Sequence, residues 1–76
     1  GGGKLMYLYT LPNWYKYDFS DSEIEEMKKN ISSRAKNSWK TEPSKQEFRD
    51  AKVELFYNYK DKFGNHFFEF SFIAGQ

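Results

Sequence analysis

The sequence predicts a small two-layer α+β domain, with elements in the order strand, helix, short helix, strand, strand, and with an antiparallel C-terminal hairpin packed against one main helix. Three observations indicate this. Two alternating runs of aromatic and β-branched residues flank a turn signal within residues 53–73, an amphipathic segment with a capping signal covers residues 20–40, and a short apolar run occupies residues 6–11. A sheet with helices on one face buries the apolar positions of such a pattern.

The composition sets how this domain can be stabilised. The chain has 76 residues and no cysteine, so disulfides and thiolate metal sites are excluded. Large rings must supply the core, because eight Phe, six Tyr and two Trp make the sequence 21% aromatic. We expect residues 6–76 to form one domain. Residues 1–5, Gly-Gly-Gly-Lys-Leu, are interpreted as a linker left by cloning.

Charge and hydropathy limit the partners. The formal net charge is +1, so attraction of the whole molecule to nucleic acid or to an anionic membrane is expected to be weak. No apolar run approaches the roughly 20 residues of a membrane span. The absence of cysteine favours an intracellular protein. We therefore expect a cytoplasmic protein without a membrane partner.

The first strand is predicted at residues 6–11. It is apolar on both faces, which is typical of a strand flanked by neighbours. Pro12 ends it, because proline cannot donate to a ladder. Residues 14–19 alternate in polarity, but an L-proline loop of two residues suits neither favoured hairpin turn. We interpret this segment as an ordered aromatic connection that packs onto the core, and whether it covers the outer sheet face stays open.

The main helix has a clear beginning. Ser20 and Glu23 form a capping-box pattern, and Phe19 and Ile24 occupy the two positions of a hydrophobic staple. An apolar stripe continues to about Lys40, with acidic residues in the first turns and basic residues after them, which complements the helix dipole. The stripe consists of Ile24, Met27, Ile31, Ala35 and Trp39.

A short second helix is expected next. Pro43 prevents simple continuation of the first helix. Residues 44–47, Ser-Lys-Gln-Glu, predict a second capping box with Phe48 as its apolar anchor. We expect one or two helical turns that end near Ala51.

The hairpin turn is predicted at residues 61–64, Asp-Lys-Phe-Gly, because Asp at the first and Gly at the fourth position are typical of a type I turn. We place Lys60 opposite Asn65. The pairs predicted on the core face are Tyr59 with His66, Tyr57 with Phe68, Leu55 with Phe70, and Val53 with Phe72. Those on the outer face are Phe56 with Glu69, Asn58 with Phe67, and Glu54 with Ser71. The first strand could join either edge of this hairpin.

His66, the only histidine, is the residue best suited to proton transfer near neutral pH. Residues 64–66, Gly-Asn-His, resemble the Gly-Ser-His element of small ribonuclease toxins of the HicA type. That resemblance covers three residues and implies a small ribonuclease that uses His66. The sequence departs from the family because no third strand or C-terminal helix follows the hairpin.

Other catalytic parts are not evident. The carboxylates lie at a helix start, in a turn or on a sheet face without a partner that would raise a pKa for acid–base work. One histidine without cysteine does not suit a transition-metal site, and the N-terminal glycines do not form a phosphate loop. We therefore predict a non-enzymatic protein without a cofactor or metal.

Two surfaces are candidate binding sites. Lys29, Lys36 and Lys40 lie within about 40° of each other on a helical wheel, away from the apolar stripe. They could meet phosphates or an acidic partner, or could simply form a solvated face. The second candidate is the outer sheet face and hairpin tip. Its residues are Phe56, Lys60, Lys62, Phe63 and Phe67.

The leading hypothesis is a small interaction or regulatory protein that binds a protein partner through these surfaces. Size, the lack of catalytic parts and the richness in Lys, Asn, Tyr and Phe are compatible with a phage or another mobile element as its source. The alternative is binding of RNA or single-stranded DNA through aromatic rings and lysines, which requires exposed rings at Phe56 and Phe67. A homodimer formed by pairing edge strands is a third hypothesis.

Overall fold

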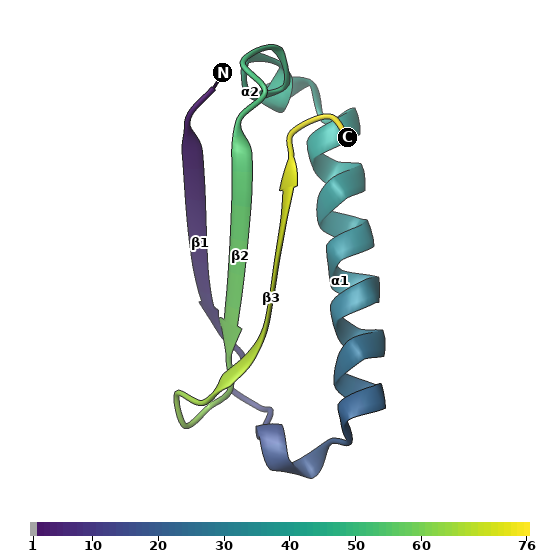
Figure 1. Ribbon diagram of the computed structural model, residues 1–76, viewed down its shortest axis with the longest axis vertical. Coiled ribbons are helices and arrows are strands. Elements are labelled where there is room, and N and C mark those ends of the chain that lie inside the picture. The colour runs from purple at the N-terminus through teal and green to yellow at the C-terminus, as the bar shows by residue number, and fades with distance from the viewer. Residues whose placement is uncertain (1) are drawn as a thin grey trace.

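The computed structural model describes residues 2–76, which form a three-stranded sheet with one long helix alongside it (Figure 1). The predicted α+β fold is confirmed. The elements are β1 (Lys4–Thr10), α1 (Asp21–Thr41), α2 (Gln46–Asp50), β2 (Glu54–Lys60) and β3 (His66–Ile73), with 3-10 turns at Lys16–Asp18 and Pro43–Lys45.

The sheet has the order β1-β2-β3, so β2 is central. Strand β1 runs parallel to β2, and β3 is antiparallel to it. The first strand therefore joins the hairpin at β2 and is an edge strand, which corrects the prediction that it is flanked by neighbours. It also begins before Met6, because Lys4 pairs with Glu54 and Leu5 pairs with Leu55.

The hairpin register differs from the predicted one. Tyr59 pairs with Phe68 and Lys60 pairs with His66, so Phe67 is an extra residue in a bulge between these two pairs. Beyond the bulge, each β2 residue meets a β3 residue two positions later than predicted. A shift of two residues preserves the faces of a strand. The core face therefore carries the predicted residues Leu55, Tyr57, Tyr59, Phe68, Phe70 and Phe72, although their partners differ from the predicted ones. The prediction for His66 is wrong, because His66 pairs with Lys60 and is exposed.

Rows of aromatic rings cross the core face of the sheet. Tyr7, Tyr57 and Phe70 form one row, with centroid separations of 5.0 and 4.9 Å. Tyr9, Tyr59 and Phe68 form the next, with separations of 5.1 and 4.8 Å. The buried cluster consists of Trp39, Val53, Leu55, Tyr57, Phe72 and Ala74. Helix α1 lies beside β3, and β1 lies on the far side of the sheet from it (Figure 1).

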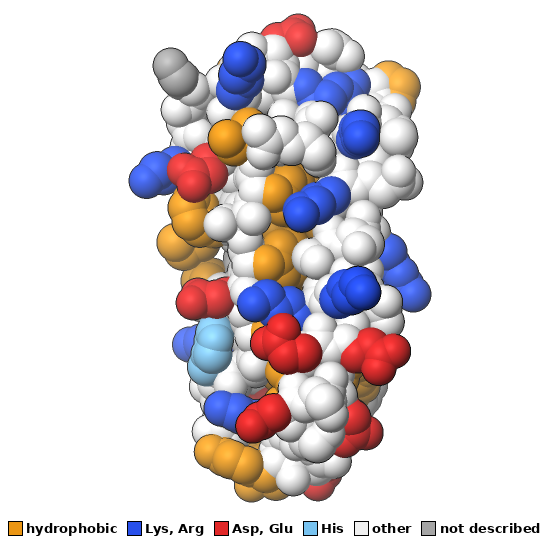
Figure 2. Space-filling view, turned by 45° about the vertical axis from the view of Figure 1, so that its right-hand side comes forward, with side chains coloured by type: hydrophobic (Ala, Val, Ile, Leu, Met, Phe, Trp, Pro, Cys, Tyr) orange, Lys and Arg blue, Asp and Glu red, His pale blue; other side chains and the backbone are white. Residues whose placement is uncertain are grey.

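Helix α1 begins as predicted. The Glu23 amide donates to Ser20 Oγ at 3.2 Å, and the Ser20 amide donates to Glu23 Oε1 at 2.8 Å, which completes the capping box. Acidic side chains gather toward the lower end of the molecule in Figure 2, where α1 begins, while several basic ones lie higher. The predicted separation of charge along the helix is therefore confirmed.

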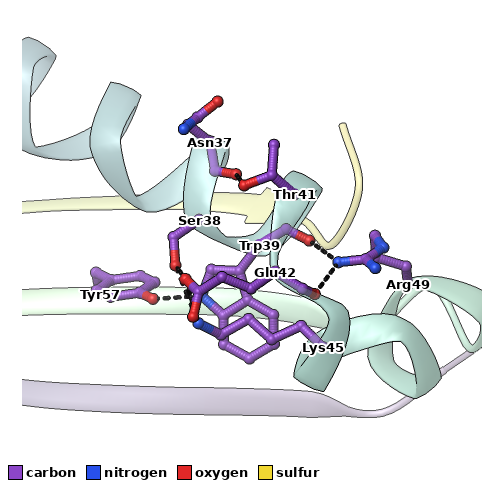
Figure 3. Close-up of polar contacts among 8 residues, drawn as sticks. All are labelled: Asn37, Ser38, Trp39, Thr41, Glu42, Lys45, Arg49 and Tyr57. Carbon is purple, nitrogen blue, oxygen red and sulfur yellow. Dashed lines mark hydrogen bonds and ion pairs between the residues drawn. The ribbon is translucent and has the colours of Figure 1, made fainter.

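The predicted second capping box is wrong, because Ser44 lies inside the 3-10 turn that starts at Pro43 and the cap of α2 makes no side-chain hydrogen bond. Arg49 stabilises this region instead. Its Nη1 donates to the backbone oxygens of Trp39 at 2.9 Å and Glu42 at 2.8 Å (Figure 3). A guanidinium at these carbonyls satisfies acceptors that a helix end leaves free.

The hairpin turn follows the prediction at residues 61–64, since the Gly64 amide donates to the Asp61 carbonyl at 3.0 Å. The Asp61 side chain is fully buried and accepts from the amides of Phe63 and Asn65, both at 2.9 Å. It also accepts from Asn65 Nδ2 at 3.1 Å and from the Lys16 amide at 2.8 Å. One carboxylate thereby ties the turn to the connection after β1.

Candidate functional site

The eight residues predicted to bind a partner are distributed over three places. Phe56 lies in the middle of β2, and the basic residues of α1 follow the helix toward the end away from the hairpin turn (Figure 1). At the tip, the Lys62 ammonium lies 5.1 Å from the centroid of the Phe63 ring. The other predicted residues are Lys60 and Phe67 at the hairpin end, and Lys29, Lys36 and Lys40 on α1.

The exposure of Phe67 that the nucleic-acid alternative requires is not found. Its side chain is only 4% exposed. The bulge places its ring 5.7 Å from Phe19 and 6.1 Å from Trp14, next to the ring of Phe68 at 5.6 Å. The outer-face pair of Phe56 and Phe67 that a stacking surface requires is therefore not formed.

The aromatic connection predicted at residues 14–19 is confirmed, because it forms a 3-10 turn and not a strand. Its Trp14 covers Phe67, and the Trp14 carbonyl accepts from the Lys62 amide at 3.0 Å. Tyr15 meets the exposed Phe63 ring edge-on at 5.1 Å. The connection thus supports the hairpin tip and leaves the outer face near β1 open.

Strand β1 carries exposed apolar residues that are not among the predicted binding residues. Met6 and Leu8 are each 69% exposed, and Tyr9 is 42% exposed. Met6 and Leu8 lie beside Phe56 and Asn58 of β2 in the register, on the face opposite the aromatic rows. The signal was present in the sequence as a run apolar on both faces, which was interpreted as burial between strands.

The backbone of β1 is also free on one side. The Gly3 carbonyl accepts from the Glu54 amide at 3.0 Å, and the Leu11 amide donates to the Lys60 carbonyl at 2.8 Å. In a parallel ladder, alternate residues bond to the same neighbour. The odd-numbered residues of β1 therefore direct their backbone N–H and C=O groups toward β2, and the even-numbered residues direct theirs away from the sheet. These even-numbered residues are Lys4, Met6, Leu8 and Thr10.

The two edges of the sheet differ in how they are shielded. Strand β3 has the bulge at Phe67, an exposed carboxylate at Glu69, and α1 beside it. Residues 5–9 of β1 contain no charge, no proline and no bulge. Within the described chain, β1 also has a single neighbouring strand. The edge at β1 is thus ready to pair with another strand.

A shallow depression of about 410 Å³ adjoins this surface. Met6 and Phe56 line one side of it, and Lys28 of α1 lines another. The Lys4 ammonium lies 5.7 Å from the centroid of the Phe56 ring. Glu69 of β3 also lines the depression, and an apolar and aromatic area with a polar margin is typical of a protein interface.

The polar residues outside this surface include His66, the one histidine of the chain. His66 is exposed at the start of β3, opposite Lys60. Residues 2–76 contain no cluster of three or more His, Cys, Asp or Glu side chains that could hold a metal ion. Among the helices of this part of the chain, none is long and apolar enough to cross a membrane.

Two tyrosines of β2, the strand next to β1, have raised pKa values. Burial raises the pKa of Tyr59 to about 12, with smaller contributions from Tyr9 and Tyr57. Burial also raises the pKa of Tyr57, although the hydrogen bond from Trp39 opposes this. The hydroxyls of Tyr57 and Tyr59 are therefore neutral near pH 7.

No protein-family model matches the chain, and comparison with curated proteins and with solved structures finds no match for it.

Proposed function

We propose that this chain is a small intracellular, non-enzymatic interaction protein that binds a protein partner through β1. The observation that carries the proposal is a strand with an open backbone edge and two side chains that are 69% exposed, Met6 and Leu8. An extended segment of a partner can add to such an edge, with main-chain hydrogen bonds giving affinity and side-chain contacts giving specificity.

The hairpin tip is the competing surface, and it can be compared directly with β1. A photo-crosslinking amino acid placed at Leu8 is expected to form a covalent adduct with a protein in the source cell. The same group at Phe63, which is 67% exposed, and at Lys36 provides matched positions on the tip and on α1. Protein adducts at Phe63 but not at Leu8 would move the site to the tip, and equal labelling at all three positions would contradict a defined site.

Binding of single-stranded nucleic acid is the second candidate, and the pairing of Lys62 with the exposed Phe63 ring is the observation that favours it. One ring with adjacent lysines offers a single stacking position, which is less than such binders commonly use. A titration with mixed RNA and single-stranded DNA at two salt concentrations tests this. Binding that weakens steeply with salt and is lost in Phe63→Ala, but retained in Leu8→Ala, would support nucleic acid over a protein partner.

A further inference from the structure

We propose that the partner strand is β1 of a second copy of this chain, and that two protomers pair antiparallel along this edge to form a six-stranded sheet. This inference rests on the proposed use of β1 as a binding edge. A twofold axis makes the paired strands antiparallel, and each protomer then contributes the same residues. Strand β1 is suited to this because its free backbone groups and its side chains are both self-complementary about Tyr7.

The register follows from the backbone. In an antiparallel pair, two opposed residues exchange N–H···O=C hydrogen bonds when the backbone groups of both point toward the other strand. The even-numbered residues of β1 must therefore lie opposite even-numbered residues of the partner. Centring the pair on Tyr7 places Lys4 opposite the partner's Thr10 and Met6 opposite the partner's Leu8. This alignment engages all four outward-facing residues of the seven-residue strand. Centring on Met6 or Leu8 would leave part of the strand unpaired.

Side chains on the outer face fit the same register. Met6 and Leu8 of one protomer meet the partner's Leu8 and Met6, so four side chains that are 69% exposed in the isolated chain form one apolar cluster at the axis. The only charge in β1 is Lys4, which lies opposite the partner's Thr10 and away from the partner's Lys4. The pairing therefore creates no directly opposed like charges, which would destabilise it.

The core face extends in the same way. Tyr7 would lie opposite the partner's Tyr7, and Tyr9 opposite the partner's Leu5. The row of Tyr7, Tyr57 and Phe70 has separations of about 5 Å, which is the spacing that neighbouring strands impose. The partner's row would continue it across the axis. Tyr9, which is 42% exposed, gains a neighbour on its open side.

The two edges of the sheet differ in their shielding, and this difference favours a second copy paired with β1 over an edge that is exposed by chance. Natural sheets shield exposed edges with charges, bulges or a covering element, because a bare edge promotes pairing with another chain. Strand β3 has these features and the central residues of β1 do not. One strand buries little surface area, and interfaces of small area are commonly weak. The fraction of chains in the dimer is therefore expected to rise with protein concentration.

Sedimentation equilibrium of the full chain over a wide concentration range tests the assembly. We expect a monomer–dimer equilibrium, and we expect Leu8→Lys to raise the dissociation constant by roughly 30-fold or more, the effect typical of a lost central contact. Phe63→Lys makes the same kind of change at an equally exposed residue away from β1 and should leave the equilibrium unchanged. Circular dichroism should show that both variants fold.

A second variant keeps the test decisive if Leu8→Lys does not fold. Met6→Pro removes an N–H that points away from β2, so it should disrupt the dimer while the β1–β2 ladder is retained. A monomer at every concentration would overturn the proposed dimer. So would a dimer that Leu8→Lys or Met6→Pro leaves intact, since its contact would then lie elsewhere.

Cysteine substitutions test the register, because the chain has no cysteine of its own. Mild oxidation of a mixture of Met6→Cys and Leu8→Cys chains should produce a covalent mixed dimer, since these residues face each other in the pair. Either variant alone should react much less. Preferential linkage within one variant would overturn the register. A monomeric chain that still gives protein adducts at Leu8 would overturn only the dimer, whereas a monomer without adducts would overturn the proposed function as well.

Discussion

The indole Nε1 of Trp39 donates a hydrogen bond of 2.6 Å to the hydroxyl of Tyr57, and this contact joins α1 to the central strand in the buried core (Figure 3). It lies where the helix ends. The Lys45 ammonium is 4.9 Å from the centroid of the Trp39 ring, and the ring of Phe48 meets it edge-on at 5.4 Å. Trp39 therefore connects the helix, the sheet and the segment between them.

Removal of both partners of this bond should cost less unfolding free energy than the sum of the two single removals. Tyr57→Phe leaves the buried indole N–H unpaired, which costs about 1–3 kcal/mol of unfolding free energy. The double variant Trp39→Phe with Tyr57→Phe should be less destabilised than the sum of the single variants, because no orphaned donor remains. Urea unfolding of the four proteins measures this, and strict additivity would contradict the coupling.

Leu55 should be among the most costly residues to truncate. Its side chain is 0% exposed, so Leu55→Ala is expected to lower the unfolding free energy by about 2–5 kcal/mol. Leu8→Ala is the matched control, and it should change the free energy by less than about 0.5 kcal/mol in dilute protein. Similar losses for both variants in denaturant titrations would show that β1 is covered under these conditions.

Acid should destabilise the protein through Asp61. Burial alone would raise the pKa of this carboxyl, but hydrogen bonds from the amides of Lys16, Asn65 and Phe63 and from the Asn65 side chain lower it to about 2, from an ordinary value of 3.8. The stabilisation is therefore present above about pH 3.8 and is lost as the pH falls toward 2.

Asp61→Asn tests this pH dependence. The variant should be less stable at neutral pH and should lose less further stability between pH 3.8 and pH 2, as followed by thermal unfolding. Asp18→Asn removes an exposed carboxylate from the nearby connection and controls for the change in net charge. Equal acid slopes in wild type and Asp61→Asn would show that other groups dominate.

Alkali should act through Tyr59. Its folded pKa of about 12 lies above the ordinary value of 10, so the stabilisation from the neutral phenol is complete below pH 10 and is lost as the pH rises toward 12. Tyr59→Phe should lose less stability across that range. Ultraviolet difference absorbance of the wild type should show tyrosines that ionise late, and titration of every tyrosine near pH 10 would contradict the buried rows.

The sequence determined the element types and the core face because these depend on local patterns. The period-two alternation of Leu55 and Tyr57 and the Ser20–Glu23 cap involve residues close together in the chain. The register was wrong because a bulge at Phe67 leaves no local signal when the next residue, Phe68, is also Phe. Burial of two adjacent rings compensates for one unpaired backbone position, and that gain depends on Trp14 and Phe19.

The candidate site was harder to predict because exposure depends on strand order. The apolar run of β1 would suit a central strand equally well, and only the sheet order β1-β2-β3 shows that β1 is at an edge. Likewise, Arg49 reaches the carbonyls of Trp39 and Glu42 only after the chain has turned at Pro43. Side-chain caps from a following segment are tertiary contacts, so the capping-box pattern at Ser44 did not determine the outcome.

The parallel pairing of β1 also has a consequence for the order of folding. Strands β2 and β3 are joined by a short turn and can pair early, whereas Lys4 must find Glu54 across fifty intervening steps of the chain. Loop closure over that length is entropically costly and slow, so β1 is expected to dock last and to open first. During that interval the inner edge of β2 is itself bare. Amide exchange should therefore be fastest in β1, and a newly made chain is most prone to mispairing before its first strand returns.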